Sequence, residues 1–300
     1  MKNPIFDIEN WREIGATLAR NKTRTFLTAF GIFWGTAMLA MLWGGAHGME
    51  GMLRRNFAGF TTNLGAVFPG QTSISFKGFN KGMQWTMTQN DVDAIRRITP
   101  NIEYSTTICQ NYGTIQYGTQ SKQAQIIGYE PDFSKILLPV IYSGRVLNES
   151  DESGSRKVAL IGKNIAAELF GTEEPVGKFI CAKGIYFLVA GVIGQTSEVN
   201  IGGRYDESVI IPSSTFRRAY NWGNQVNFFM YTADAGHAPS ELKPYIIRAI
   251  CANHPISPED DKAMWFMDIS EEFNMIDNLF LGVSLLALFV GAGSLMAGII

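Results

Sequence analysis

The residues that could do chemistry are few and scattered along this chain of 300 residues. Gly162-Lys163 and Gly177-Lys178 are followed by Asn and Phe, whereas a phosphate-binding loop needs Ser or Thr after its Gly-Lys pair. The three histidines, His47, His237 and His254, lack the short spacing of metal ligands. The sequence therefore predicts no catalytic residues, no metal ligands and no cofactor-binding residues.

The remaining reactive side chains also have ordinary explanations. The acidic pairs Asp260-Asp261 and Glu271-Glu272 are typical of a solvated surface or a helix start. The sequence has no basic patch of the kind that binds nucleic acid, so we expect no nucleic-acid partner. Three cysteines allow at most one internal disulfide, and three buried thiols are the simpler reading; they are Cys109, Cys181 and Cys251.

Two apolar segments dominate the organisation of the chain. Residues 25–46 and 279–300 are each 22 residues long and carry no charged side chain. About 20 helical residues cross a bilayer core of roughly 30 Å. We therefore predict transmembrane helices at both positions, the first of them an uncleaved anchor because it is longer than a signal-peptide core.

Basic residues set the predicted orientation. Arg20, Lys22 and Arg24 precede the first apolar segment, and cytoplasmic flanks carry the positive charge. Residues 1–24 are thus predicted to be cytoplasmic and residues 47–278 extracytoplasmic.

The cytoplasmic segment has the pattern of an amphipathic helix over residues 4–20. We expect this helix to lie along the inner membrane interface or to pack on a cytoplasmic partner, and the pattern does not separate the two. Its apolar face is formed by Ile8, Trp11, Ile14 and Leu18.

Small residues recur four apart in both apolar segments, a spacing that lets helix backbones approach closely in lipid. This pattern favours association with other membrane helices. The candidate packing positions are Gly31, Gly35, Gly44, Gly48, Gly293 and Ala297.

The region between the apolar segments reads as an α+β fold. Strand-helix-strand patterns occur over residues 49–112 and 222–270 and predict one porter-like subdomain. Residues 113–221 are richer in short strands and predict a β-rich insertion, with a polar loop at 148–157. A capping box at Thr88 and Asp91 marks the start of the first helix.

Both ends of this region are predicted to continue into the membrane as unbroken helices. Ser270 is a candidate N-cap, and no helix breaker separates it from residue 279. Residues 49–57 extend the first apolar segment in the same way. Two continuous helices would form a stiff stalk.

Four segments resemble the MacB/FtsX-type ABC transporter permeases and their MacB-like periplasmic core domain. One is the entry into the first apolar segment, residues 18–31, and another is Val209-Ile-Ile-Pro212. The others are Gly128-Tyr-Glu-Pro-Asp-Phe133 with Ser143-Gly-Arg145, and Val158-Ala-Leu-Ile-Gly162 with the stretches that follow it to residue 192.

The resemblance implies a permease subunit of the bacterial inner membrane that works by mechanotransmission. A partner ATPase would bind ATP, so that this chain needs no cofactor and is not itself an enzyme. It also implies four spans, hence two beyond residue 300, a homo- or heterodimer in the lipid membrane, and in some members a periplasmic adaptor protein. We expect the chain to be part of a longer permease, truncated in its second span.

Two other classes fit the same topology. A two-span sensor with an extracytoplasmic ligand-binding domain would continue into a signalling module after residue 300. A membrane-anchored enzyme is disfavoured by the missing nucleophile, base and metal ligands.

Overall fold

A computed structural model describes residues 22–56, 61, 63–195 and 201–299. Two compact units are present: one combines the chain up to Leu53 with the chain from Asn274, and the other is Arg54–Phe273. The predicted amphipathic helix at 4–20, with Arg20, lies outside the described residues.

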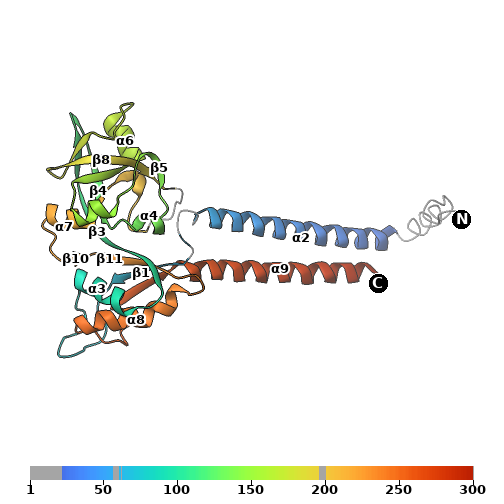
Figure 1. The fold of residues 1–300 in the computed structure, drawn as a ribbon. Helices are drawn as coiled ribbons and strands as arrows, with labels where there is room; N and C mark the ends of the chain where they lie inside the picture. The colour runs from blue at the N-terminus through green and yellow to red at the C-terminus, as the bar shows by residue number, and fades with distance from the viewer. Residues whose placement is uncertain (1–21, 57–60, 62, 196–200, 300) are drawn as a thin grey trace. The chain divides into compact units, whose positions relative to one another are not determined.

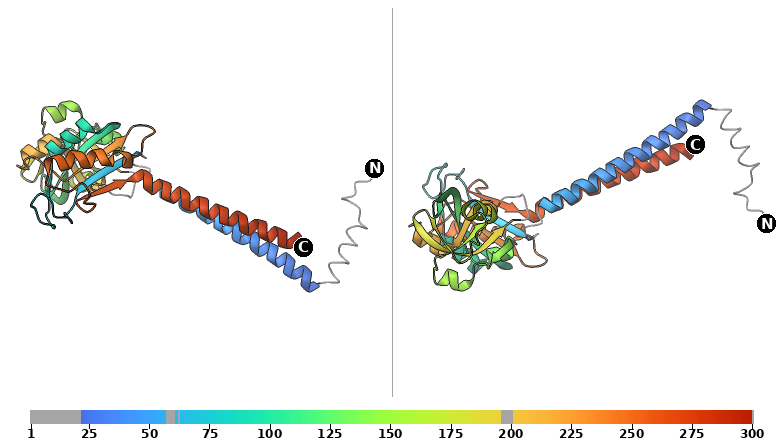
Figure 2. Two further views of the ribbon diagram at one scale, coloured as in Figure 1. Left: turned by 90° about the horizontal axis from the view of Figure 1, so that it is seen from below. Right: turned by 90° about the horizontal axis from the view of Figure 1, so that it is seen from above.

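The first unit consists of two long helices. Helix α2 is Lys22–Asn56, and helix α9 is Ile269–Ile299, of which the unit holds the part from Asn274. The two helices run alongside each other in opposite directions (Figures 1 and 2). The prediction that both helices continue unbroken past the apolar segments is confirmed, as far as Asn56 for α2.

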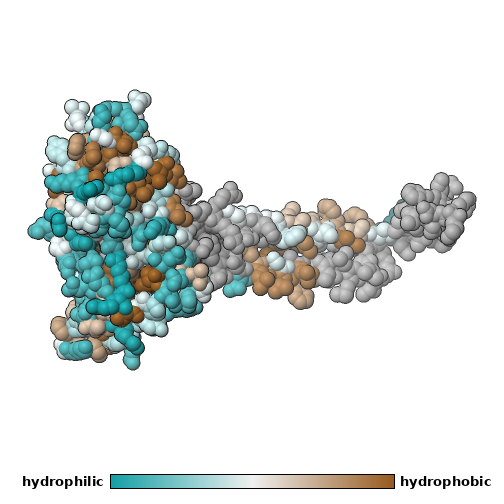
Figure 3. Space-filling model, in the orientation of Figure 1, coloured by the Kyte–Doolittle hydropathy of each residue, from teal (hydrophilic) through white to brown (hydrophobic). Residues whose placement is uncertain are grey.

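Large apolar side chains are exposed along both helices (Figure 3). The predicted spans at 25–46 and 279–300 fall on α2 and α9. Across the part of the chain that the structure describes, no helix combines the length and the apolar character of a membrane span. Membrane insertion of the two segments therefore stays a prediction.

The second unit is built on a ten-stranded sheet with the main strand order β12-β1-β11-β3-β4-β9-β6-β8-β5. Its first four strands are antiparallel and form the porter-like part. They are β12 (Met264–Asp268), β1 (Leu64–Pro69), β11 (Phe228–Ala233) and β3 (Ile102–Tyr117). Helices α3 (Gln89–Ile98) and α8 (Pro239–Asn253) pack with one face of these strands in a single core.

The other strands form the β-rich part with mixed parallel and antiparallel pairing. The strands are β4 (Gln120–Tyr129), β5 (Val140–Gly144), β6 (Val158–Gly162), β7 (Phe179–Ala182), β8 (Ile185–Gly194) and β9 (Ser208–Pro212). The helices are α4 (Phe133–Ile136), α5 (Glu149–Ser153), α6 (Lys163–Phe170), α7 (Ser213–Ala219) and the short η2 (Tyr205–Glu207). A separate two-stranded sheet pairs β2 (Met87–Thr88) with β10 (Gln225–Val226).

Strand β3 joins the two parts. Up to Ile108 it pairs with β11, and from Cys109 it pairs with β4. This change of partner precedes residue 113, where the sequence pattern predicts the insertion to begin. One strand of 16 residues thus belongs to both parts and links them directly.

A shared hydrophobic core strengthens this link. Alternate residues of β11 face opposite sides: Phe228 and Met230 join one cluster, while Phe229 and Tyr231 pack under the helices. The first cluster also contains Tyr129 and other buried residues of the β-rich part. Strand β11 is buried on both faces, and its alternate side chains pack into two different cores. The core that it shares with the β-rich part therefore joins the two parts into one body.

The sequence of residues 64–76 reads as a strand interrupted at Pro69-Gly70, and β1 does end at Pro69; a Cβ atom at Gly70 would lie 2.3 Å from the carbonyl oxygen of Lys262. Beyond Gly70, only isolated bridges at Gln71 and Phe76 remain of the expected strand. A second local expectation is wrong. The predicted polar loop at 148–157 contains helix α5, because Asn148 and Asp151 cap it reciprocally.

Candidate functional site

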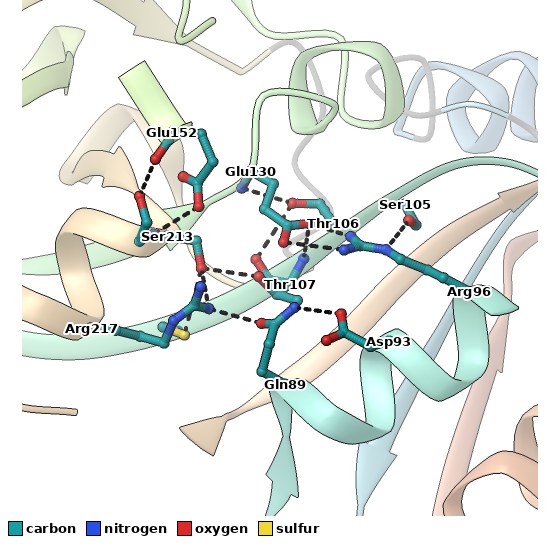
Figure 4. A network of polar contacts seen from close by, with 12 residues as sticks. Gln89, Asp93, Arg96, Ser105, Thr106, Thr107, Glu130, Glu152, Ser213 and Arg217 are labelled. Carbon is teal, nitrogen blue, oxygen red and sulfur yellow. Dashed lines mark hydrogen bonds and ion pairs between the residues drawn. The ribbon is translucent and has the colours of Figure 1, made fainter. Parts of the chain in front are cut away.

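The segment Gly128–Phe133 sits where β4 ends and α4 begins. Tyr129 and Phe133 are buried with ring centroids 5.2 Å apart. Gly128 is needed because a Cβ atom there would lie 2.7 Å from the Cβ of Phe216. These contacts fix the backbone on both sides of Glu130, which lies beside the crossing strand β3 (Figure 4).

Glu130 connects the porter-like part to the β-rich part. Its carboxylate forms an ion pair with Arg96 of α3 and accepts a hydrogen bond of 3.3 Å from the N–H of Thr107. The backbone N–H of Glu130 donates to the hydroxyl of Thr106 at 3.1 Å. Arg96 also donates from Nε to Ser105 at 3.0 Å, so its guanidinium group is held from two sides.

A second link runs from α7 to the same crossing. The hydroxyl groups of Ser213 and Thr107 lie 3.0 Å apart. Arg217 donates from Nη1 to Ser213 and to Gln89, the first residue of α3, each at 3.0 Å. Nearby Cys109 is buried, and burial raises the pKa of its thiol to about 11, so the thiol is inert.

A third group at this junction is the carboxylate of Glu152 in α5. It accepts a hydrogen bond of 2.9 Å from the N–H of Ser214. Burial raises the pKa of Glu152, the hydrogen bond from Ser214 works against this, and the nearby Glu130 adds to it. Its second oxygen, Oε2, has no hydrogen-bond partner among the described residues.

These residues border a cleft of about 250 Å³. Its walls carry one arginine and four carboxylates but no histidine or cysteine; its lining is Arg96, Ser105, Glu130, Pro131, Asp132, Glu149 and Glu152. Among the described residues, no group of three or more potential ligands is arranged to hold a metal ion. We call the linked residues described above the polar junction, and their arrangement suits holding two parts of a domain together (Figure 4). They are Gln89, Arg96, Ser105, Thr106, Thr107, Glu130, Glu152, Ser213 and Arg217.

The segment Ser143–Arg145 is held by a buried carboxylate. Arg145 donates to both oxygens of Asp151, at 2.6 and 3.1 Å. Burial alone would raise the pKa of Asp151, but the hydrogen bonds from Arg145 and Asn148 keep it below its ordinary value of 3.8. Gly144 has a φ of 77°, and a Cβ atom there would lie 2.2 Å from the Ala190 carbonyl oxygen.

Gly162, at the end of the Val158–Gly162 segment, is a close-approach position. A Cβ atom there would lie 2.1 Å from the carbonyl oxygen of Tyr205. The resemblance segments that contain Gly128, Gly144 and Gly162 therefore mark tight backbone contacts, and the first of them also supplies Glu130 to the polar junction.

The predicted packing positions lie on the long helices. Gly35 is buried, whereas Gly31, Gly44, Gly48 and Gly293 are exposed, and a Cβ atom at any of these four would meet no other atom within 4 Å. The side chains of Ala297 and Arg24 lie outside the described set, and Lys22 is exposed. The roles predicted for these residues stay predictions.

The start of α9 differs from expectation. The N-cap is Asp268 rather than Ser270: Asp268 Oδ1 accepts from the N–H and the hydroxyl of Ser270, at 2.8 and 2.6 Å. Its other oxygen accepts a 2.9 Å hydrogen bond from the N–H of Ser240 near the start of α8. One carboxylate thus caps two helices, because a strand that ends at Asp268 brings both helix starts together.

Sequence reasoning missed most of the polar junction. Among its members only Glu130 falls within a segment that the resemblance singles out. Arg96, Ser213 and Arg217 look like ordinary surface residues of short helices, and only the strand pairing of β3 brings them together.

The fold defines an α+β domain whose chain continues at both ends into long helices. The chain belongs to the MacB-like periplasmic core domain family, whose model matches residues 25–249.

Known proteins share this domain over much of its length. The chain is 24% identical to the macrolide export ATP-binding/permease protein MacB of Bdellovibrio bacteriovorus over 296 residues, which cover 97% of the chain and 45% of that protein. It is 27% identical over 198 residues to the MacB protein of Syntrophobacter fumaroxidans, covering 66% of the chain and 28% of that protein. The chain therefore spans less than half the length of these relatives.

A solved structure has the same fold. The periplasmic region of MacB from Actinobacillus actinomycetemcomitans superimposes with a TM-score of 0.59 at 18% identity, over 74% of this chain and 96% of that one.

Proposed function

We propose that the chain is part of a permease subunit of an ABC transporter of the MacB/FtsX type. In this proposal residues 47–278 form the extracytoplasmic domain, and residues 25–46 and 279–300 anchor it in the bacterial inner membrane with the N-terminus in the cytoplasm. The observation that carries the proposal is the family match over residues 25–249.

Membrane anchoring is supported by composition and exposure. Each anchor segment has 22 residues without a charged side chain. Phe33 and Met41 of α2 are 65% and 77% exposed, and Phe289 of α9 is 73% exposed. Exposure of so many large apolar groups is costly in water and favourable in lipid.

Partners follow from the names of the relatives, which include an ATP-binding part that this chain lacks in sequence. We propose that a cytoplasmic ATPase, separate or fused elsewhere, binds ATP and drives the permease. A homo- or heterodimer of permease subunits and a periplasmic adaptor belong to the same proposal.

Mechanotransmission requires a domain that moves without deforming. The strand β3, the shared core and the polar junction supply that stiffness, since each joins the porter-like part to the β-rich part. ATP-driven movement of the long helices would then be passed to the whole domain, rather than being absorbed between its two parts.

Expression of the full gene product with an affinity tag tests this proposal. We expect a cytoplasmic ATPase to copurify from detergent extracts or to be present as another domain of the same gene product. Spin labels on a Ser153→Cys variant of the dimer, with the three native cysteines replaced by serine, should then change their separation when ATP turnover with vanadate traps ADP. A gene product that neither contains nor copurifies with an ATPase, or a label separation that is identical with and without trapped nucleotide, would refute the coupling.

A further inference from the structure

A cleft of about 490 Å³ lies within the second unit. Three segments form it: the turn that follows β1, the residues just before β2, and the chain around β10. Its lining is Pro69, Gly70, Gln71, Gln84, Trp85, Thr86, Trp222, Gln225, Val226 and Asn227.

The walls of this cleft are held firmly. Gln71 and Gln84 form an isolated antiparallel bridge, and Val226 of β10 pairs with Met87 of β2. Trp85 is 7% exposed, and its indole N–H donates to the Ala263 carbonyl at 2.6 Å. A pre-formed cleft loses little conformational entropy when a ligand enters.

The chemistry of the lining is polar but uncharged. None of the ten lining residues is an acid, a base or a histidine, and four of them carry side-chain amides. The side-chain amides of Gln84 and Gln225 are exposed, and neither side chain forms a hydrogen bond within the described part of the chain. Each amide offers both a donor and an acceptor.

Trp222 adds an unused donor and an aromatic surface. Its indole nitrogen Nε1 is buried and has no acceptor among the described residues. The ring packs edge-on against Phe216, with centroids 5.4 Å apart, which fixes its orientation. Because Nε1 is itself buried, an acceptor on a ligand reaches it only if neighbouring side chains shift, and that contact would satisfy a donor whose isolation is unfavourable.

We propose that this cleft binds a neutral saccharide. A sugar ring presents hydroxyl groups that donate and accept along its rim and an apolar C–H face that packs on an aromatic ring. A charged ligand would find no counter-charge here, and a wholly apolar ligand would leave the amides desolvated and unpaired. This inference goes beyond the permease proposal, which holds with or without it.

Titration calorimetry of the 1–300 chain in nanodiscs tests the proposal, with maltohexaose and chitohexaose as probes and empty nanodiscs as the blank. We expect at least one of them to bind with a Kd below about 1 mM. Gln84→Ala, Gln225→Ala and Trp222→Phe should each weaken that binding by about three- to tenfold, since each removes a hydrogen bond. Trp222→Phe keeps an aromatic ring at the position but removes the N–H and part of the ring surface, so its effect reports the contribution of the indole as a whole.

Gln120→Ala is the matched control, because Gln120 is exposed at the start of β4, outside this cleft, and should leave binding unchanged. Absence of heat with both sugars would overturn the proposal. So would equal affinity of the cleft variants and the control, or binding of hexa-alanine in place of the sugars, which would make the cleft a peptide site.

Discussion

Asp91 is the buried carboxylate that ties α3 to α8. It is fully buried and accepts hydrogen bonds from the N–H and hydroxyl of Thr88, both at 2.8 Å, and from Asn253 at 2.8 Å. Nε2 of His254 lies 2.8 Å from its Oδ2. Burial alone would raise the pKa of Asp91, but the bonds from His254, Asn253 and Thr88 together keep it below 3.8.

We expect Asp91→Asn to lower the free energy of unfolding by about 3 kcal/mol. The amide offers one acceptor oxygen where the carboxylate offers two, so donors of Thr88 or His254 lose their partner. Urea denaturation measures the change. Asp93→Asn is the control, because Asp93 is exposed on the same helix, and a loss as large as that of Asp91→Asn would contradict the role given to burial.

Stability should fall in acid. The folded pKa values of Asp91, Asp151 and Asp260 are all below 3.8. Their contribution is therefore complete above pH 3.8 and is lost as the pH falls through the folded values. Glu152 has the opposite sign, because its raised pKa favours folding as it protonates.

Thermal unfolding between about pH 3 and 7 measures this profile. We expect a shallow slope near neutrality and a steep loss of Tm below about pH 4. In Asp91→Asn the steep part should be smaller. A Tm that is unchanged down to pH 3 would show that these carboxylates are not linked to folding.

At the residue scale, the sequence predicts the capping box of Thr88 and Asp91 but not the burial of Asp91 under α8. The reason is physical: Asn253 and His254 lie more than 160 positions along the chain from Asp91. Local spacing reports local hydrogen bonds, while the partners that a buried charge acquires depend on tertiary packing.

At the scale of elements, Asp268 is the residue that determines where α9 begins. Asp268→Ala should lower the free energy of unfolding by about 1 to 2 kcal/mol, because the carboxylate accepts N–H groups at the starts of both α8 and α9. Ser270→Ala should cost less than about half of that, because the Ser270 hydroxyl donates to Asp268 instead of accepting a helix N–H as an N-cap does. Urea denaturation measures the free energy of unfolding of both variants. Equal losses in the two variants would show that Ser270 contributes as much to the start of α9 as Asp268 does.

The ion pair between Arg96 and Glu130 links helix α3 of the porter-like part to the loop between β4 and α4 in the β-rich part. A double-mutant cycle with Arg96→Ala and Glu130→Gln should give a coupling energy of about 1 kcal/mol, since the two side chains are only 33% and 13% exposed. The same cycle on Lys122 and Glu168, where Glu168 is 55% exposed, should give a value closer to zero. A coupling energy for Arg96 and Glu130 that is no larger than that for Lys122 and Glu168 would show that this ion pair does not stabilise the polar junction.

Most helices and strands are visible in the sequence because their periodicity is strong. Helix α8, Pro239–Asn253, falls inside the strand-helix-strand pattern of residues 222–270, and strand β6, Val158–Gly162, falls inside the strand-rich stretch 113–221. Strands β5 and β7 and helices α4 and α7 were missed. They have four to seven residues each, which is too short to show a period.

At the scale of the whole molecule, the chain combines a MacB-like periplasmic core domain with two long helices. Glycines and buried carboxylates of the α+β domain lie where two backbone segments approach each other closely, as at Gly144 and Gly162. Its function as proposed depends on stiffness and on placement outside the membrane rather than on reactive groups.

Placement outside the membrane is tested most directly by labelling intact cells with a membrane-impermeant maleimide. Ser153→Cys puts an exposed thiol on α5, and Lys22→Cys puts one on the flank predicted to be cytoplasmic. The unsubstituted chain gives the background from its own three free cysteines. The account predicts that Ser153→Cys is labelled in intact cells and Lys22→Cys only after lysis; labelling of Lys22→Cys alone in intact cells would contradict it.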